Sequence, residues 1–163
     1  MKFELEWKGE RYLLEWFENV DFEKLKDVVQ SYGFIFDKKG RVCIVDCDKG
    51  YWTLPGGTVE DSDESYEETL RREVDEEADL DIKNIREVGG FKVTPLSENC
   101  ERGVHYILRY VAEVDKMKKQ TVDPCNGKIS KRKFVSVGEF GDYVKWGKDG
   151  EFQLGKALEV LGE

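Results

Sequence analysis

The sequence predicts an α/β fold, and two patterns lead to this prediction. Several short stretches place apolar side chains at every second position, which is typical of strands that bury one face. Residues 65–79 instead repeat their apolar side chains at every fourth position, which is typical of an amphipathic helix. The chain has 163 residues, of which 39% are hydrophobic, enough for one compact domain with a core. We therefore expect a single domain over residues 1–163.

The N-terminal segment has the pattern of a β-hairpin. Phe3, Leu5 and Trp7 alternate with polar residues, a Lys-Gly pair at residues 8–9 suits the turn, and a second apolar run covers residues 12–17. The hairpin could pair with a second chain or cover its own sheet, and we favour the second. Whether the protein is a monomer or a homodimer stays open.

Strands and turns continue along the chain. Residues 21–30 have apolar side chains at helical spacing, and then Tyr32, Phe34 and Phe36 alternate on one strand that a turn at residues 38–40 ends. Further strands are expected at residues 41–47, 85–92, 105–113 and 132–137, and a closing helix at residues 151–161.

The central helix has a recognisable start and end. Ser65 and Glu68 have the capping-box pattern, in which the serine side chain caps an amide and the glutamate reaches back to the serine amide. The apolar stripe consists of Tyr66, Leu70, Val74 and Ala78. The helix should end near Asp79, because Asp tolerates the left-handed conformation that follows many helices.

The formal net charge of −9 is concentrated in one segment. Residues 60–79 hold eleven Asp or Glu against two Arg, a net of −9 that equals the total for the chain. This balance argues against nucleic acid or an anionic membrane as a partner, because both attract Lys and Arg. A smaller basic cluster at residues 116–133 is interpreted as an exposed surface hairpin, with contact to substrate phosphates as the alternative.

The cysteines do not form a zinc-binding pattern. Cys43, Cys47, Cys100 and Cys125 include no CxxC pair, and a single histidine cannot complete a zinc site with them. The sequence shows no signal-peptide pattern and no apolar run of the length that a membrane helix needs. We therefore expect a cytoplasmic protein with reduced thiols and no membrane contact.

Three glutamates share one face of the central helix. Glu76 and Glu77 lie three and four residues after Glu73, which places all three side chains within an arc of roughly 100°. Such crowding is unfavourable unless a cation compensates, and carboxylate oxygens suit Mg²⁺ or Mn²⁺. A solvated acidic surface is the alternative. Gly56 and Gly57 favour the interpretation as a metal site, because they can bring bare backbone close to a cation or a phosphate.

Together these residues resemble the Nudix box, a glycine, a spaced Glu and then Arg-Glu-apolar-x-Glu-Glu-x-Gly-apolar. The matching residues are Gly57, Glu64, Arg72, Glu73, Val74, Glu76, Glu77 and Leu80. Family-like context, including a Trp-x-Leu-Pro-Gly phrase at residues 52–56, extends over residues 31–161. Residues 1–30 would be an N-terminal hairpin extension outside this core. The resemblance implies a Nudix-like α/β/α sandwich with a mixed central sheet.

Two positions depart from the family pattern. Six residues rather than the usual five separate Gly57 from Glu64, and Asp79 stands where the family has its closing glycine. The extra residue falls in the polar loop at residues 58–63, where added length has a small entropic cost. Neither change removes a residue from the implied metal site.

The resemblance implies roles for the residues of the box. The implied ligands of Mg²⁺, or of Mn²⁺, are the Gly56 carbonyl, Glu73, Glu76 and Glu77. Arg72 and Glu64 would orient them. A metal would neutralise the charge of a substrate diphosphate and activate a water. The implied reaction is hydrolysis of a nucleoside diphosphate linked to another group, as in nucleoside triphosphates, ADP-ribose-like compounds and nucleotide sugars. A binding module of the same fold that does not cleave its nucleotide is the alternative.

The general base is not identified by the sequence. Some relatives use a glutamate just before the late Phe-Val-Ser strand, where this chain has Lys133. Glu76 or Glu77 could take the proton from the water, and we prefer them to Glu98 or Glu101 in a turn-rich segment.

Other candidate side chains receive a structural interpretation. His105 opens a predicted strand and is interpreted as a hydrogen-bonding histidine. The aromatic residues Tyr32, Phe34, Phe36 and Trp52 are interpreted as core rather than as a stacking surface for a base.

Overall fold

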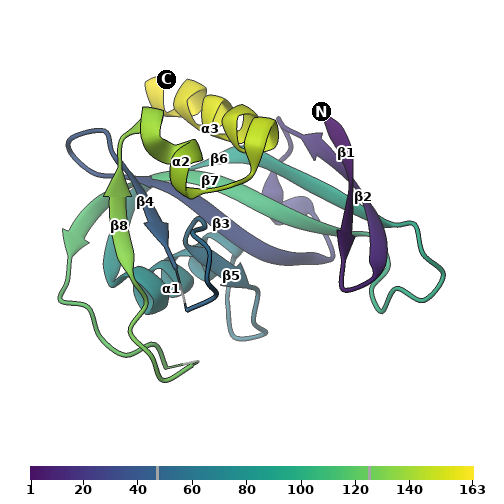
Figure 1. The fold of residues 1–163 in the computed structure, drawn as a ribbon, viewed down its shortest axis with the longest axis horizontal. Helices are drawn as coiled ribbons and strands as arrows, with labels where there is room; N and C mark the ends of the chain where they lie inside the picture. Colours follow the sequence, from purple (N-terminus) through teal and green to yellow (C-terminus); the bar gives the residue numbers. More distant parts are fainter. Residues whose placement is uncertain (47, 125) are drawn as a thin grey trace.

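The centre of the protein is a mixed β-sheet of eight strands (Figure 1). The computed structural model describes residues 1–46, 48–124 and 126–163. The strands are β1 (Lys2–Trp7), β2 (Glu10–Phe17), β3 (Val28–Phe36), β4 (Val42–Val45), β5 (Gly56–Thr58), β6 (Leu80–Pro95), β7 (His105–Met117) and β8 (Arg132–Val135). Their order is β1-β2-β6-β7-β3-β4-β8, and β5 adds to β3. The pairing of β3 with β7 is parallel and the other strand pairings are antiparallel.

Helices cover both faces of the sheet. The helices are α1 (Tyr66–Ala78), α2 (Phe140–Tyr143) and α3 (Gly147–Gly162), with short 3-10 turns at Phe22–Lys24 and Val137–Glu139. Figure 1 places α1 on one side of the sheet and α2 and α3 on the other. Ile35 packs in the core beneath α1, and its neighbour Phe34 packs in the core beneath α3. The predicted α/β/α sandwich with a mixed sheet is therefore confirmed.

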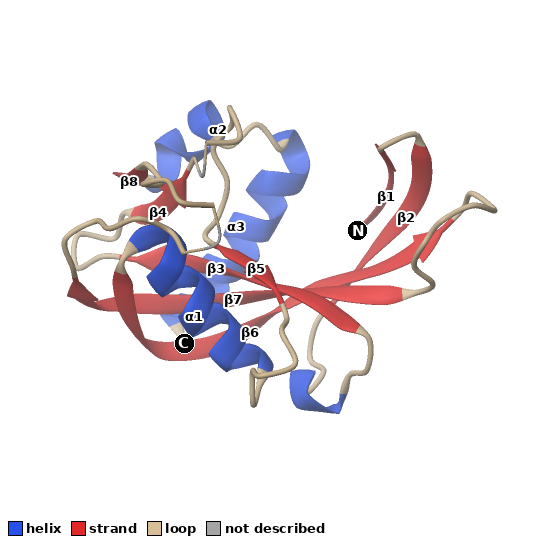
Figure 2. Ribbon diagram, turned by 90° about the horizontal axis from the view of Figure 1, so that it is seen from below, coloured by secondary structure: helices blue, strands red, loops and turns tan. Residues whose placement is uncertain are grey.

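The predicted N-terminal hairpin is also confirmed, and it joins the central sheet. Trp7 pairs with Glu10 across its turn, and β2 pairs with β6 through partners such as Leu14 and Val93. Figure 2 shows the sheet curling, so that β1 and β2 stand on the same side of it as α3. The hairpin therefore extends the sheet instead of standing apart from it.

Helix α1 begins and ends where the sequence predicts. Ser65 Oγ accepts a hydrogen bond from the Glu68 amide at 3.0 Å, and Asp79 ends the helix with a left-handed φ of 51°. One detail differs, because the Glu68 carboxylate accepts from the amide of Glu64 rather than from that of Ser65. The Asp79 carboxylate also accepts hydrogen bonds from the amide and the hydroxyl of Thr121. Asp79 therefore both replaces the family's glycine and binds the following loop.

Three local predictions need correction. Helical spacing at residues 21–30 produces only the 3-10 turn, because Asp27 adopts a left-handed φ of 60° and β3 begins directly after it. The described residues between 116 and 133 do not form a hairpin, since β8 pairs with β4 rather than with β7. The strand expected up to residue 137 ends at Val135, where Ser136 instead starts a 3-10 turn closed by the Glu139 carboxylate.

The structure describes the surroundings of two of the four cysteines. Cys43 is buried and Cys100 is half-buried. The expectation for Cys47 and Cys125 lies outside the described residues. No helix in the described part of the chain has the length and apolar character needed to cross a membrane.

Candidate active site

Two glycines bring the backbone of β5 against β3 and α1. Gly56 has a φ of 149°, and a Cβ there would lie 2.3 Å from the carbonyl oxygen of Ser31. A Cβ on Gly57 would lie 2.5 Å from the Cδ atom of the Glu73 carboxylate. Both distances are too short for a side chain, so glycine is needed at each position to let this loop approach its neighbours.

The three predicted glutamates of α1 gather beside this glycine loop. Glu77 Oε2 accepts a hydrogen bond from the Gly56 amide at 3.2 Å, and the Glu73 carboxylate lies under Gly57. Glu76 Oε2 lies 3.5 Å from Arg72 Nη1, the same nitrogen that donates to Glu73 Oε1 at 3.1 Å. The helix therefore presents all three partly buried carboxylates toward one region of the surface.

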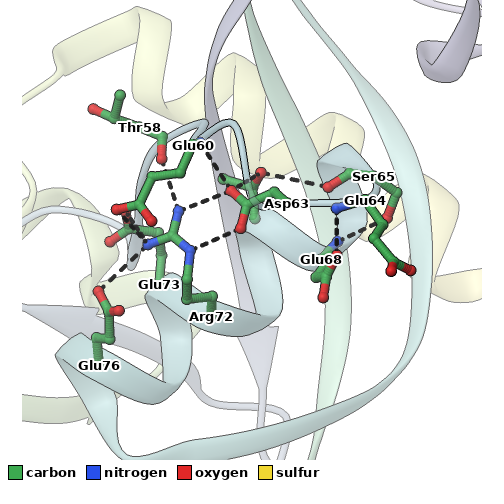
Figure 3. A network of polar contacts seen from close by, with 10 residues as sticks. Thr58, Glu60, Asp63, Glu64, Ser65, Glu68, Arg72, Glu73 and Glu76 are labelled. Atoms are coloured by element: carbon green, nitrogen blue, oxygen red, sulfur yellow. Dashed lines mark hydrogen bonds and ion pairs between the residues drawn. The ribbon is translucent and has the colours of Figure 1, made fainter.

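Arg72 is the centre of the polar network beside these glutamates (Figure 3). Its Nε and Nη2 atoms both donate to the Asp63 carboxylate at 2.9 Å, in a two-pronged pair. Nη2 also donates to the Thr58 carbonyl at 2.9 Å, and Nη1 lies 3.5 Å from the Glu60 carboxylate. A planar guanidinium suits such a network, because its fixed donors can bind several acceptors at once. Arg72 thus connects the glycine loop to α1.

The carboxylate that holds Arg72 belongs to Asp63, whereas the resemblance gave Glu64 a role beside Arg72 in orienting the metal ligands. Glu64 is exposed, and Figure 3 shows it beside Ser65 and Glu68, away from the guanidinium. The Asp63 side chain is only 4% exposed. Counting from Gly57 would have found it, because Asp63 keeps the usual spacing of five intervening residues. The extra residue shifts Glu64 out of the place that the pattern assigns to it.

The network changes the ionisation of its members. Hydrogen bonds from Arg72 hold the pKa of Asp63 well below its ordinary value, and the bonds to Asp63 raise the pKa of Arg72. Burial raises the pKa of Glu73, and Arg72 only partly offsets this effect. Asp63 is thus the main partner of Arg72, whereas the net effect of burial and Arg72 on Glu73 favours its neutral form.

The carboxylates of α1 and the carbonyl groups of the glycine loop are suitable ligands for a hard divalent cation. Carboxylate and carbonyl oxygens are the ligands that Mg²⁺ and Mn²⁺ prefer, and Gly57 leaves the Glu73 carboxylate uncovered by any side chain at that position. Within residues 1–46, 48–124 and 126–163, no three His, Cys, Asp or Glu side chains converge closely enough to form a ready-made chelate. Mg²⁺ commonly keeps several waters and shares its coordination with substrate phosphates, so a loose set of carboxylates suits it.

The remaining candidate side chains lie in different surroundings. Lys133 Nζ lies 4.9 Å from the ring centroid of Tyr143 and 5.8 Å from that of Trp52, so this position makes cation–π contacts. Glu98 and Glu101 are exposed on the loop between β6 and β7. The general base is therefore not identified by these contacts.

His105 and the aromatic residues of β3 have structural surroundings. His105 Nδ1 lies 2.9 Å from the Gly103 carbonyl, a hydrogen bond of the kind expected. Phe34 and Phe36 are buried, as expected of core residues. Tyr32 and Trp52 are half-buried, so their rings are only partly enclosed.

Comparison with known proteins identifies the family. The family model of the NUDIX domain matches residues 28–154. The chain belongs to the Nudix family. This membership confirms the predicted enzyme class, a hydrolase acting on phosphoric anhydrides. None of the curated proteins is a significant match to the sequence.

Solved structures show the same Nudix fold. The Bacillus subtilis pyrophosphohydrolase BsRppH has a TM-score of 0.68 at 19% identity, and the match covers 97% of each chain. A match of this length includes residues of the N-terminal hairpin. An ADP-ribose pyrophosphatase from Streptococcus suis has a TM-score of 0.60 at 22% identity, covering 85% of this chain and 94% of the other. The NUDIX domain of Shewanella oneidensis NrtR, complexed with ADP ribose, has a TM-score of 0.61 at 20% identity, covering 88% and 94%.

The contact between Gly57 and Glu73 leads to a testable expectation. Gly57→Ala should lower kcat about 10- to 100-fold, because the new Cβ must displace the Glu73 carboxylate. Steady-state kinetics on an accepted substrate measures this change. Gly155→Ala in α3 is the matched control, since a Cβ there meets no atom within 4 Å. Equal activity of the two variants would contradict the role given to Gly57.

Proposed function

We propose that this Nudix hydrolase cleaves a phosphoric anhydride bond in a nucleoside diphosphate derivative, with Mg²⁺ as its cofactor. The observation that supports this most strongly is the position of Glu73 and Glu77 against the glycine loop, with Glu76 linked to Glu73 through Arg72. Without a cation, such a set of carboxylates would be an unfavourable arrangement on one helix.

We propose the Gly56 carbonyl, Glu73, Glu76 and Glu77 as the residues that hold the metal. When bound, Mg²⁺ would supply charge neutralisation for the diphosphate and a lower pKa for the attacking water. Arg72 keeps Glu73 and Glu76 in place through its Nη1 atom, and Asp63 keeps Arg72 in place. Glu76 or Glu77 would accept the proton of the water at a carboxylate oxygen.

The substrate class rests on the chemistry of the site and on similar proteins. A divalent cation held by carboxylates suits a ligand with adjacent phosphates, whose oxygens complete the coordination. Among proteins of similar fold, one is named as an ADP-ribose pyrophosphatase, and another was solved with ADP ribose. ADP-ribose, nucleoside triphosphates and nucleotide sugars are therefore the first compounds to test.

A substrate panel with and without metal tests this function. We expect hydrolysis of at least one of these compounds with Mg²⁺ or Mn²⁺, and none in EDTA. Chromatography of the products identifies the broken bond, because cleavage within ADP-ribose releases AMP and ribose 5-phosphate. Nucleotide binding without turnover of any compound in the panel would instead favour a non-catalytic module and overturn the proposal.

A further inference from the structure

A cavity of about 780 Å³ lies between the N-terminal hairpin and the start of β3. We call it the hairpin trough, and its principal lining residues are Trp7, Tyr12, Gln30, Tyr51, Arg102 and His105. They come from the hairpin, from β3, from the loop after β4, and from the loop and strand that follow β6. The volume falls within the roughly 300–1,000 Å³ that small-molecule sites occupy. The trough is thus large enough for a nucleoside.

Aromatic side chains are exposed around this trough. Trp7 is 57% exposed and Tyr51 is 51% exposed, although both are large rings. Leu5, which is 42% exposed, lines the same cavity. Isolated apolar residues on a surface are ordinary, but three of them around one concavity indicate a site for an apolar or planar group. Every nucleobase has a planar face that can stack on such rings.

The polar lining suits the rest of a nucleotide. Lys8, Lys49 and Arg102 line the trough against only two acidic residues, in a chain whose net charge is −9. One of the acidic residues, Glu10, accepts a hydrogen bond from the Tyr12 hydroxyl at 2.6 Å. This small excess of basic side chains suits a ligand that carries phosphate at one end.

His105 adds a defined acceptor to the lining. Because a carbonyl can only accept, the contact with the Gly103 carbonyl places a hydrogen on Nδ1. In the neutral ring Nε2 is then an acceptor, suited to an amino or hydroxyl donor of a ligand.

Two lining residues connect the trough to the surroundings of the α1 glutamates. Thr58 lines the trough, and its carbonyl accepts the hydrogen bond from Arg72. Tyr32 also lines it, and this residue pairs with Gly56 in the sheet. A ligand in the trough can therefore extend along β5 to the glutamates.

We propose that the hairpin trough binds the base and sugar of the nucleotide substrate, with Trp7 and Tyr51 as stacking residues and the diphosphate leading past Thr58. This assignment rests on the proposed function for the direction in which the diphosphate extends. It gives the hairpin a role in substrate selection, since Trp7 and Tyr12 precede the residues that the family model matches. Other sequences at these positions would select other bases.

Equilibrium binding in EDTA tests the trough separately from hydrolysis. The probes are ADP-ribose and ribose 5-phosphate, which lacks a base. We expect ADP-ribose to bind wild type at least about tenfold more tightly than ribose 5-phosphate, and Trp7→Ala to remove about tenfold of its affinity. Trp7→Phe keeps a stacking ring and should restore most of it. Ile129→Ala, at a 58% exposed side chain that is not among the lining residues, is the control and should bind as wild type.

The possible results separate this proposal from the proposed function. Unchanged affinity for ADP-ribose in both Trp7→Ala and Tyr51→Ala would contradict the proposal that the trough binds the base and sugar. The absence of ADP-ribose binding to wild type at millimolar concentration would contradict it as well. A Trp7→Ala protein that only changes from dimer to monomer also overturns it, since the exposed rings would then cover a second copy. If Trp7→Ala weakens binding of ADP-ribose while the wild type hydrolyses no compound of the panel, the proposed binding site is supported and the proposed function is contradicted.

Discussion

Glu77→Gln is expected to lower kcat by about 10³-fold. The side-chain oxygen of Gln can still accept the hydrogen bond from the Gly56 amide, so the backbone of the glycine loop should stay in place. The variant lacks only the negative charge that would bind a divalent cation or accept a proton. Initial rates at saturating Mg²⁺ and substrate measure the effect, and the midpoint of thermal unfolding verifies that the variant is folded.

Glu67→Gln provides the matched control on the same helix. The Glu67 side chain is 44% exposed and pairs with Arg71 at 3.1 Å, away from the glycine loop. Its kcat should stay within about twofold of wild type, because a change in surface charge alone has a small effect. Glu77→Gln with half or more of the wild-type rate would refute the assignment of Glu77 to the site.

The second large effect is expected at Asp63. Asp63→Asn should lower the free energy of unfolding by about 2–3 kcal/mol, because Arg72 loses a charged partner that is almost fully enclosed. It should also lower kcat about 10- to 100-fold, since Arg72 positions Glu73 and Glu76. Denaturant unfolding and steady-state kinetics measure the two effects.

Glu64→Gln tests whether the site depends on Asp63, as the structure indicates, or on Glu64, as the family pattern indicates. This exposed residue should change the free energy of unfolding by no more than about 0.5 kcal/mol. If Glu64→Gln were instead the damaging variant and Asp63→Asn were neutral, the arrangement around Arg72 would be wrong.

The Asp63 effect should also depend on pH. The pKa of Asp63 is lower in the folded protein than its ordinary value of 3.8, so its contribution to stability is complete above that value and disappears as the pH falls. The difference in unfolding free energy between wild type and Asp63→Asn should therefore decrease below about pH 4. A difference that grows on acidification would contradict the charge pairing.

Local patterns predicted the elements whose causes are local. The cap at Ser65, the stripe through Leu70 and Val74, and the left-handed end at Asp79 depend on neighbours within one or two helical turns. The turn at residues 8–9 likewise determines the first hairpin. Each of these features was therefore predictable from the order of residues.

Features that depend on distant residues could not be predicted in this way. The partner of β8 is β4, and loop length alone does not choose between β4 and β7. The spacing from Gly57 favours Asp63 and the residue type favours Glu64, so only the packed loop shows which carboxylate reaches the Arg72 guanidinium. Arg109 is buried, with its Nε atom 2.8 Å from Gln153 Oε1 on α3, although an arginine in a strand suggests an exposed position.

The central claim is that the carboxylate face of α1 holds the metal that makes this protein a hydrolase. Mn²⁺ titration followed by electron paramagnetic resonance, on wild type and on Glu77→Gln, tests it most directly. We expect wild type to bind Mn²⁺ and Glu77→Gln to bind it at least about tenfold more weakly, in parallel with its loss of hydrolysis. Equal Mn²⁺ affinity of the two proteins would place the metal elsewhere and contradict the claim.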